Sequence, residues 1–390
     1  MTTTPWNQAR RLLCVRLGGL ADVLMCTPAM RALRAQHPAR RLTLLASPAG
    51  AALAPYLDDV DEVIAYQAPW AAGAAVQPER QPERQRGQQG VQACGQECSP
   101  ECGVQCAPIA ALAAHRFDAA VIFTSYRQSA LPAALLCQLA GIPLRLAYCC
   151  ENPYQLLSDW IADPEPGGMR RHEVQRQLDL VHRIDAEIAD ERLAFTPAAA
   201  DIDAVRTRLR GLGIDPDRRW LVLHPGAGAL SRPYPPHYWQ TLVRTLGERV
   251  RCPLVFTGAA HEAALAAQIA AGAGIPVHSF AGQLHIGELG ALLAQASLVV
   301  SNNTGPAHLA AAVGTPVVGL YALTGPRHTP WRVPSRVLDH DVDCRNCERS
   351  VCPQGHSDCP EKRAPVRVVD AICSLLKQAE PYRRRENRMA

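Results

Sequence analysis

The chain has 390 residues, 48% hydrophobic and 19% charged, with a formal net charge of +4 at pH 7. This length and composition indicate a globular protein of about two or three domains, and they exclude a disordered chain and a membrane bundle. The net charge is too small for this length to indicate a nucleic-acid-binding surface, so we expect no nucleic acid partner.

Short apolar runs alternate with helical patterns in both halves of the chain. The expected strands are Leu12–Val15, Leu42–Ala46, Val63–Tyr66 and Ala119–Phe123 in the first half, and Trp220–Leu223, Leu254–Phe256, Leu298–Val300 and Val317–Tyr321 in the second. Such runs, separated by helices, predict parallel sheets with helices on both faces. The sequence therefore predicts an α/β protein of two Rossmann-like domains whose sheets face a central cleft.

The predicted domain boundary follows a long helical pattern at His172–Ile188. We place one domain at residues 1–195 and the other at 196–390. Residues 68–108 interrupt the first domain, because they are rich in Gln, Gly, Pro and Glu and carry too little apolar surface to fold alone. We interpret them as a flexible insertion.

Four cysteines of this insertion recur at every fourth position: Cys94, Cys98, Cys102 and Cys106. They could form a fourfold thiol site. Pro100 and the neighbouring glycines, however, would break any helix that aligned the thiols. We favour a loop without a defined site over a thiol site here.

The stretch RLLCVRLGGLADVLMCTP at Arg11–Pro28 is the most informative part of the first half. It places Asp22 at the carboxyl end of the first strand, which is the edge where open α/β sheets bind ligands. Gly18 and Gly19 permit a tight turn and let a substrate approach the backbone. The run lacks the G-x-G-x-x-G fingerprint, which argues against a dinucleotide site.

Two interpretations of Asp22 stay open at this point. It could cap the following helix by accepting bonds from exposed backbone N–H groups. Alternatively, Thr27 could cap the main helix, since Pro28 after it suits a first helical turn. Asp22 would then be available as a general base that takes a proton from an attacking hydroxyl.

The loop HPGAGALSRPYPPHYW follows the first strand of the second half. It contains His224 and Gly226, and its cation Arg232 could hold a diphosphate. The alternative is that Arg232 is an ordinary surface arginine in a loop.

A second loop, VSNNTGPAHL, again joins a strand to a helix through Asn303, Thr304 and Gly305. Backbone N–H groups and the positive end of the helix dipole bind phosphate at such a terminus. His308, inside this helix, is either a buried structural histidine or a ligand contact. A third loop, ALTGPRHTPW, places Thr324 and Gly325 where they could close over the phosphates. Three loops at one sheet edge predict a nucleotide diphosphate site.

Together these motifs resemble glycosyltransferase family 9, the bacterial heptosyltransferases of the two-domain GT-B fold. The resemblance runs from Arg11 to Leu376 outside the insertion, and it is carried by RLGGLADVLMCTPAMRAL, HEVQRQLDLV, HPGAG with PYPPHYW, and SNNTGPAHLAAAVGTPVVGLY. It implies an inverting transferase without a catalytic metal. The implied donor is a nucleotide diphosphate sugar, with ADP-heptose as the leading candidate, and the second domain would bind it. The first domain would bind a lipid-linked or oligosaccharide acceptor of the lipopolysaccharide core or a similar envelope saccharide.

The resemblance also assigns roles to single residues. Asp22 matches the loop Asp that acts as general base. Arg232 stands in place of the Lys that contacts the phosphate of the sugar donor, which keeps the positive charge but changes the geometry of the hydrogen bonds. Ala21 stands where the family has Gly. Asn303 stands where it has Asp, which removes a negative charge near the donor. These departures keep the transferase class and leave the identity of the donor sugar open.

Two other functions fit the same architecture. A sugar-nucleotide epimerase or hydrolase would share the fold but would need acid and base groups around the donor sugar. A non-catalytic nucleotide-binding protein would share the donor loops. The intact loop glycines and Asp22 favour the transferase over both.

A cluster of cysteines stands near the C-terminus, with spacing C-x2-C-x4-C-x6-C. Four thiolates at such intervals suit a tetrahedral structural zinc or an iron, and reduced free thiols are the alternative. A closed four-thiolate site leaves no open coordination position, so we predict a structural role. The predicted ligands are Cys344, Cys347, Cys352 and Cys359.

The stretch Met1–Gln8 has no charged and apolar regions of a signal peptide, and no apolar run is long enough to span a membrane. We therefore expect a cytoplasmic protein. The arginines at 383–385 and 388 are typical of a solvated tail, with peripheral contact to the inner face of the inner membrane as the alternative.

Overall fold

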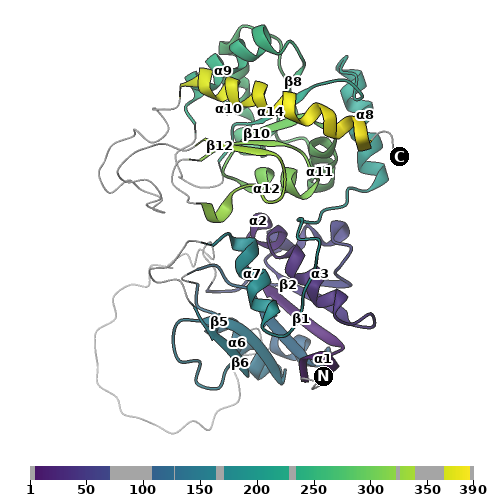
Figure 1. Ribbon diagram of the computed structural model, residues 1–390, viewed down its shortest axis with the longest axis vertical. Helices are drawn as coiled ribbons and strands as arrows, with labels where there is room; N and C mark the ends of the chain where they lie inside the picture. Colours follow the sequence, from purple (N-terminus) through teal and green to yellow (C-terminus); the bar gives the residue numbers. More distant parts are fainter. Residues whose placement is uncertain are drawn as a thin grey trace, which may run out of the picture.

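The computed structural model describes residues 5–70, 108–126, 128–163, 171–227, 234–321, 326–338 and 364–386. Two parallel sheets of six strands each form its frame, one from each half of the chain (Figure 1). The predicted α/β architecture of two Rossmann-like units is confirmed. The boundary between residues 195 and 196 stays a prediction, consistent with all strands of one sheet preceding it and all strands of the other following it.

The first sheet has the order β3-β2-β1-β4-β5-β6, with β1 near its centre. Its strands are β1 (Arg11–Arg16), β2 (Arg41–Ala46), β3 (Glu62–Ala65), β4 (Ala119–Ile122), β5 (Leu144–Cys149) and β6 (Asp159–Ala162). After its first residue β1 is buried throughout, as expected of a central strand covered on both faces.

The second sheet has the order β12-β11-β10-β7-β8-β9. Its strands are β7 (Leu221–His224), β8 (Leu254–Phe256), β9 (His278–Ser279), β10 (Leu298–Asn302), β11 (Val317–Leu320) and β12 (Ser335–Leu338). Every strand pair in both sheets is parallel, so the carboxyl ends of all strands in a sheet point to one edge.

Helices connect the strands and cover the sheets. In the first half they are α1 (Pro5–Gln8), α2 (Leu20–Leu24), α3 (Thr27–Ala35), α4 (Pro48–Ala51), η1 (Ala54–Tyr56), a helix at 108–114, α6 (Leu131–Leu139) and α7 (Glu173–His182). In the second half they are α8 (Ala199–Gly211), α9 (Pro236–Arg249), η2 (Ala260–Glu262), α10 (Ala263–Ala273), α11 (Ile286–Gln295), α12 (Gly305–Ala312), η3 (Pro326–His328) and α14 (Pro365–Glu386). Proline stands in the first turn of α3, α9 and α12, where its missing N–H costs nothing.

The helix expected at His172–Ile188 is shorter than predicted. It ends at His182, and Asp185 then has a left-handed backbone with φ of 61°. The chain turns there and runs without helix to α8, so the second half of that prediction is wrong. Among the described residues, no helix is long and apolar enough to cross a membrane.

The two halves pack against each other at the edge that carries the loops. Helices α2 and α12 face one another between the sheets in Figure 1, and they are in contact. One buried apolar cluster runs through both halves and includes Val23 of α2, Phe195 of the connecting segment and Ala307 of α12. The fold therefore brings the first loop of the chain against the start of α12.

Candidate active site

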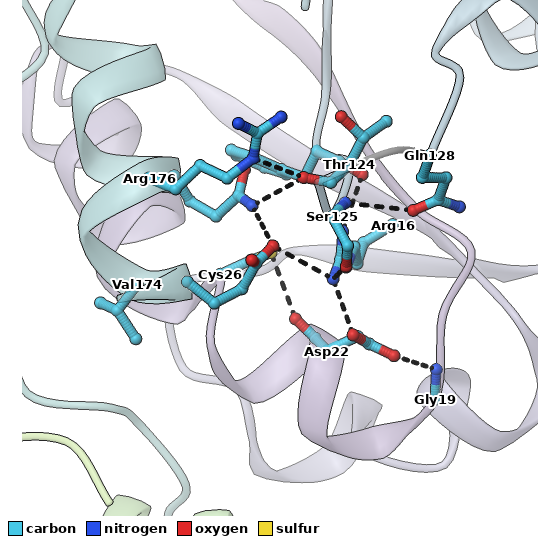
Figure 2. A network of polar contacts seen from close by, with 12 residues as sticks. Arg16, Gly19, Asp22, Cys26, Thr124, Ser125, Gln128, Val174 and Arg176 are labelled. Atoms are coloured by element: carbon cyan, nitrogen blue, oxygen red, sulfur yellow. Dashed lines mark hydrogen bonds and ion pairs between the residues drawn. The ribbon is translucent and has the colours of Figure 1, made fainter. Parts of the chain in front are cut away.

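Asp22 lies in α2, directly after the turn that follows β1. Its Oδ1 atom accepts a hydrogen bond of 2.7 Å from Nη2 of Arg16, and its Oδ2 atom accepts one of 2.8 Å from the backbone N–H of Gly19 (Figure 2). The Arg16 side chain is 1% exposed, whereas that of Asp22 is 30% exposed. The carboxylate is thus held at both oxygens and still reaches solvent.

Gly18 is required by the carboxylate itself. A Cβ atom at this position would overlap the Oδ2 atom of Asp22. We expected the glycines of this turn to admit a substrate to the backbone. The structure gives Gly18 a further reason, which is room for the Asp22 side chain, and Gly19 supplies the N–H that orients it.

The question of the helix cap has a mixed answer. Gly19 is the N-cap residue of α2, and Asp22 accepts its backbone N–H from the third helical position, so Asp22 takes part in the cap but is not the N-cap residue itself. Thr27 does not cap α3 with its side chain: its hydroxyl donates to the carbonyl oxygen of Leu24 at 2.7 Å and accepts from the N–H of Ala194 at 2.9 Å. Of the two open alternatives, the one in which Thr27 caps the main helix is therefore wrong. Asp22 caps with one oxygen and meets Arg16 with the other.

Arg16 is the centre of a buried polar network (Figure 2). Its guanidinium donates to the Phe123 carbonyl oxygen at 3.2 Å and to the Ser125 hydroxyl at 2.8 Å. Nη2 also lies 3.6 Å from Oε1 of Glu173, the first residue of α7. Sequence reasoning missed both Arg16 and Glu173. The available signal was a charged residue at the end of a buried strand and another at the start of the HEVQRQLDLV motif.

The surroundings of Asp22 set its ionisation. Burial disfavours the charged carboxylate, but the Arg16 guanidinium and the Gly19 N–H outweigh burial and hold the pKa of Asp22 below its ordinary value. His328 acts in the same direction from the other half of the molecule. Asp22 is therefore ionised at neutral pH and able to accept a proton.

The start of α12 stands opposite Asp22. Its N-cap residue, Thr304, makes no side-chain capping hydrogen bond with the described residues, and a Cβ atom on Gly305 would lie 3.4 Å from Cδ2 of Leu20 in α2. Thr304 and Gly305 are thus placed at an uncapped helix N-terminus beside the Asp22 loop. Asn303 comes directly before them, after β10. An anion would be stabilised at such a helix end.

Asn302 joins two of the three predicted donor loops, and sequence reasoning missed it. Its Nδ2 atom donates to the carbonyl oxygens of Pro225 and Gly226 at 2.8 and 3.1 Å. The loop after β7 is therefore fastened to the end of β10. The available signal was a polar residue at the last position of an apolar strand.

His224 and Gly226 lie at the carboxyl end of β7, beside Glu262. Nδ1 of His224 is 3.1 Å from Oγ1 of Thr257, and burial lowers the pKa of His224 to about 4 although the Glu262 charge opposes this. A Cβ atom on Gly226 would overlap the Glu262 carboxylate. Glu262, which also accepts the Ala259 N–H at 2.7 Å, was missed by sequence reasoning because it belongs to η2, which follows a different strand.

His308 is 2% exposed, and its Nδ1 atom has no hydrogen-bond partner among the described residues. Burial lowers its pKa to about 3, helped by His328 and His172 and opposed by Asp22. Its burial agrees with a structural role. A satisfied structural histidine, however, would have a partner on that nitrogen. Both interpretations of His308 remain open.

A segment after η3 connects the two halves. Nε2 of His172 is 2.8 Å from the carbonyl oxygen of Thr329, and the His172 ring packs on Trp331 with centroids 4.4 Å apart. His172 also caps α7, because its Nδ1 accepts the N–H of Val174 at 3.1 Å. The guanidinium of Arg327 lies 4.5 Å from the centre of the Tyr126 ring.

Several predicted site residues lie outside the described residues. They are Arg232, Thr324 and Gly325 of the donor loops, the four cysteines Cys344, Cys347, Cys352 and Cys359, and the cysteines of the insertion. Within the described part of the chain, no group of three or more His, Cys, Asp or Glu side chains could hold a metal ion. The predicted site at Cys344, Cys347, Cys352 and Cys359 is not tested by this, because those cysteines lie outside the described residues.

Known proteins match this chain in sequence and in fold. Lipopolysaccharide heptosyltransferase 1 of Pseudomonas aeruginosa is 34% identical over 167 residues, which cover 41% of this chain and 44% of that protein. The chain thus matches less than half the length of this relative. ADP-heptose lps heptosyltransferase II of E. coli shares 20% identity with a TM-score of 0.69, over 95% of this chain and 99% of that chain.

The iron-containing dodecameric glycosyltransferase TibC of enterotoxigenic E. coli is more distant. It has a TM-score of 0.52 at 14% identity, over 95% of this chain and 77% of that chain. At these identities the likeness to the two solved structures shows a shared fold, and the predicted GT-B arrangement is confirmed. The model of glycosyltransferase family 9 (heptosyltransferase) matches residues 109–363, which is more than half of the chain. The chain therefore belongs to glycosyltransferase family 9, the heptosyltransferase family.

Proposed function

We propose that this protein is an inverting glycosyltransferase that transfers a heptose or related sugar from a nucleotide diphosphate sugar, ADP-heptose, to a lipopolysaccharide core or similar envelope saccharide. One observation carries the proposal. The Asp22 carboxylate is held at both oxygens, which keeps its pKa below the ordinary value, and it is 30% exposed. Its helix α2 contacts α12, whose N-cap residue Thr304 makes no side-chain capping bond with the described residues. A base and an anion-binding helix end thus lie on two helices that are in contact.

In this reaction the acceptor hydroxyl oxygen attacks the anomeric carbon while the bond from that carbon to the diphosphate breaks. The nucleoside diphosphate leaves with the bonding electron pair, and Asp22 takes the hydroxyl proton. Attack from the side opposite the leaving group inverts the anomeric centre. The placement of Asp22 in the first half and the α12 N-terminus in the second supports an acceptor domain at 1–195 and a donor domain at 196–390.

Donor binding is assigned to the second sheet edge and the loop glycines. Thr304 and Gly305 would receive the diphosphate at the start of α12, with Arg232 as the cation that offsets its charge. No catalytic metal is needed in this scheme. The other proposed donor contacts are Gly18, Gly19, His224, Gly226, Asn303, His308, Thr324 and Gly325.

The acceptor proposed here is lipid-linked or an oligosaccharide, and we propose a cytoplasmic protein with at most peripheral contact to the inner membrane. The cysteines at 344–359 are proposed to hold a structural zinc or iron away from the chemistry. TibC, which has the same fold and contains iron, makes this proposal worth testing.

A panel of nucleotide sugars tests the function. The full chain is melted with each compound, the compound that raises the melting temperature most is incubated with lipopolysaccharide core acceptors, and the anomeric configuration of the product is determined. We expect an ADP-sugar to stabilise the protein and to give an inverted glycoside. Epimerised or hydrolysed donor without acceptor product would instead support an epimerase or hydrolase, and donor binding without turnover would support a non-catalytic protein.

A further inference from the structure

The buried network behind Asp22 contains two carboxylates for one guanidinium. Arg16 meets Asp22 at 2.7 Å and Glu173 at 3.6 Å, both through Nη2. Among the described residues, Arg16 is the only cation within ion-pair distance of Glu173. Arg176, which lies in α7 with Glu173, pairs with Asp163 through two hydrogen bonds of 2.7 and 2.8 Å. The group of Arg16, Asp22 and Glu173 therefore carries one net negative charge when both carboxylates are ionised.

The two carboxylates differ in what they can reach. Glu173 is 2% exposed and its Oε1 accepts a hydrogen bond of 2.8 Å from Nε2 of Gln177, which is itself buried. Asp22 is 30% exposed, and its helix α2 contacts α12. Glu173 is thus shut away from solvent, and a proton that arrives from the exposed side of the network reaches Asp22.

Proton transfer changes the charge balance of this group. If Arg16 were paired with Asp22 alone, protonation of Asp22 would leave a guanidinium that is 1% exposed without an anion, and a buried unpaired charge is costly. With Glu173 present, protonation of Asp22 leaves a neutral Arg16–Glu173 pair. The three groups of the network are thus balanced in the state that exists after the proton has moved.

We propose that Glu173 is a positioning residue for the base: it remains as the counter-ion of Arg16 when Asp22 becomes protonated, so that Asp22 can accept the acceptor proton without stranding a buried cation. The catalytic part of this inference rests on the proposed function. The sharing of Arg16 by two carboxylates does not, and it can be tested without substrate.

The substrate-free test is a double-mutant cycle on thermal stability. Asp22→Asn and Glu173→Gln each leave Arg16 with one carboxylate, so each should lower the melting temperature only modestly. The double variant leaves Arg16 with none, and its loss should exceed the sum of the two single losses. Additive losses would overturn the proposal.

Two further variants keep this test sharp. Asp163→Asn is the matched control, because it breaks the buried ion pair between Asp163 and Arg176 of α7, which does not involve Arg16. Its combination with Asp22→Asn should be additive. If the double variant of Asp22 and Glu173 does not fold, adding Arg16→Met removes the stranded cation and should restore folding. A triple variant no more stable than the double would overturn the charge-sharing argument.

The catalytic test uses the same variants. Glu173→Gln should lower kcat about 10- to 100-fold, part of the effect of a positioned base, and leave KM for the donor unchanged. Asp163→Asn should lose stability and keep its kcat. Wild-type kcat in Glu173→Gln, with Asp22→Asn inactive, would overturn the role of Glu173. Full activity in Asp22→Asn would instead refute the proposed base and leave the stability cycle to decide on the sharing of Arg16.

Discussion

Arg16 and Asp22 form an ion pair of 2.7 Å that joins a buried guanidinium to a partly exposed carboxylate. The pair is local in sequence, since Arg16 ends β1 and Asp22 lies in α2 directly after the following turn, but its environment is built by distant parts of the chain. Ser125 follows β4, Glu173 begins α7, and His328 belongs to the second half. The ion pair is therefore the point where the chemistry proposed for this protein can be perturbed most directly.

The first prediction concerns Asp22. Asp22→Asn keeps the shape and the hydrogen bond from Gly19 but cannot accept a proton. Turnover should fall about 10²- to 10⁴-fold, or roughly 3–5 kcal/mol of barrier, while donor binding stays unchanged. Steady-state kinetics and nucleotide titration by calorimetry measure both. An Asn variant with near-normal turnover would limit Asp22 to capping α2, since Asn caps about as well as Asp.

The second prediction concerns Arg232, which lies outside the described residues. Charge-assisted hydrogen bonds to a phosphate contribute about 1.5–3 kcal/mol. Arg232→Ala should therefore raise the dissociation constant of the donor by roughly 10- to 150-fold, and Arg232→Lys should recover part of the loss. Equal nucleotide affinity in the Ala variant and the wild type would place the diphosphate elsewhere.

The third prediction concerns the cysteines at 344–359. Elemental analysis of protein purified without added metal should find one zinc or iron per chain, as expected for a four-thiolate structural site. Cys347→Ser should remove the metal and lower the melting temperature, and a serine at Cys373, which is outside the cluster, is the control. Metal-free protein with full stability and activity would show that the thiols are free.

The fourth prediction is a pH dependence that arises from His172. Burial, with His328 nearby, lowers the pKa of His172 to about 4 even though the Thr329 carbonyl opposes this. The unfolded chain thus binds a proton at higher pH than the folded chain does, and the folded state loses stability as the pH falls from about 6.5 toward about 4. Protonation would also remove the acceptor that caps α7.

Melting curves across this pH range test the effect. His172→Asn retains a capping side chain but does not titrate, so its stability should decline less between pH 6.5 and 4 than that of the wild type. His182→Asn is the control, since His182 lies at the exposed end of the same helix. Identical pH profiles for wild type and His172→Asn would assign the acid sensitivity to other groups.

Sequence alone determined the frame of the molecule. The eight strands predicted from apolar runs all exist, because hydrophobic periodicity is a local property of the chain. Seven of them are buried and continuously apolar, as expected of parallel strands covered on both faces, and β3 is a partly buried edge strand. It also placed Asp22, Thr304 and Gly305 at sheet edges, because the turn after a buried strand is marked by glycine and proline. The four remaining strands have weaker patterns. β6, β9 and β12 lie at or near the sheet edges and are only partly buried, and the apolar run of β5 is interrupted by Arg145.

Only the tertiary structure decided what surrounds these residues. Arg145 and Arg16 are buried because carbonyl oxygens of other segments accept hydrogen bonds from their guanidinium groups, and Arg16 also forms an ion pair with Glu173. No local sequence pattern indicates these partners. The positions of Glu262 and Glu173 were likewise set by tertiary packing. The Glu262 carboxylate occupies the space that a side chain at Gly226 would need, and Glu173 lies beside Arg16 although it belongs to α7, far along the chain. A buried charge is tolerated only where distant groups compensate it, so its position and its function follow from the packing of the whole chain.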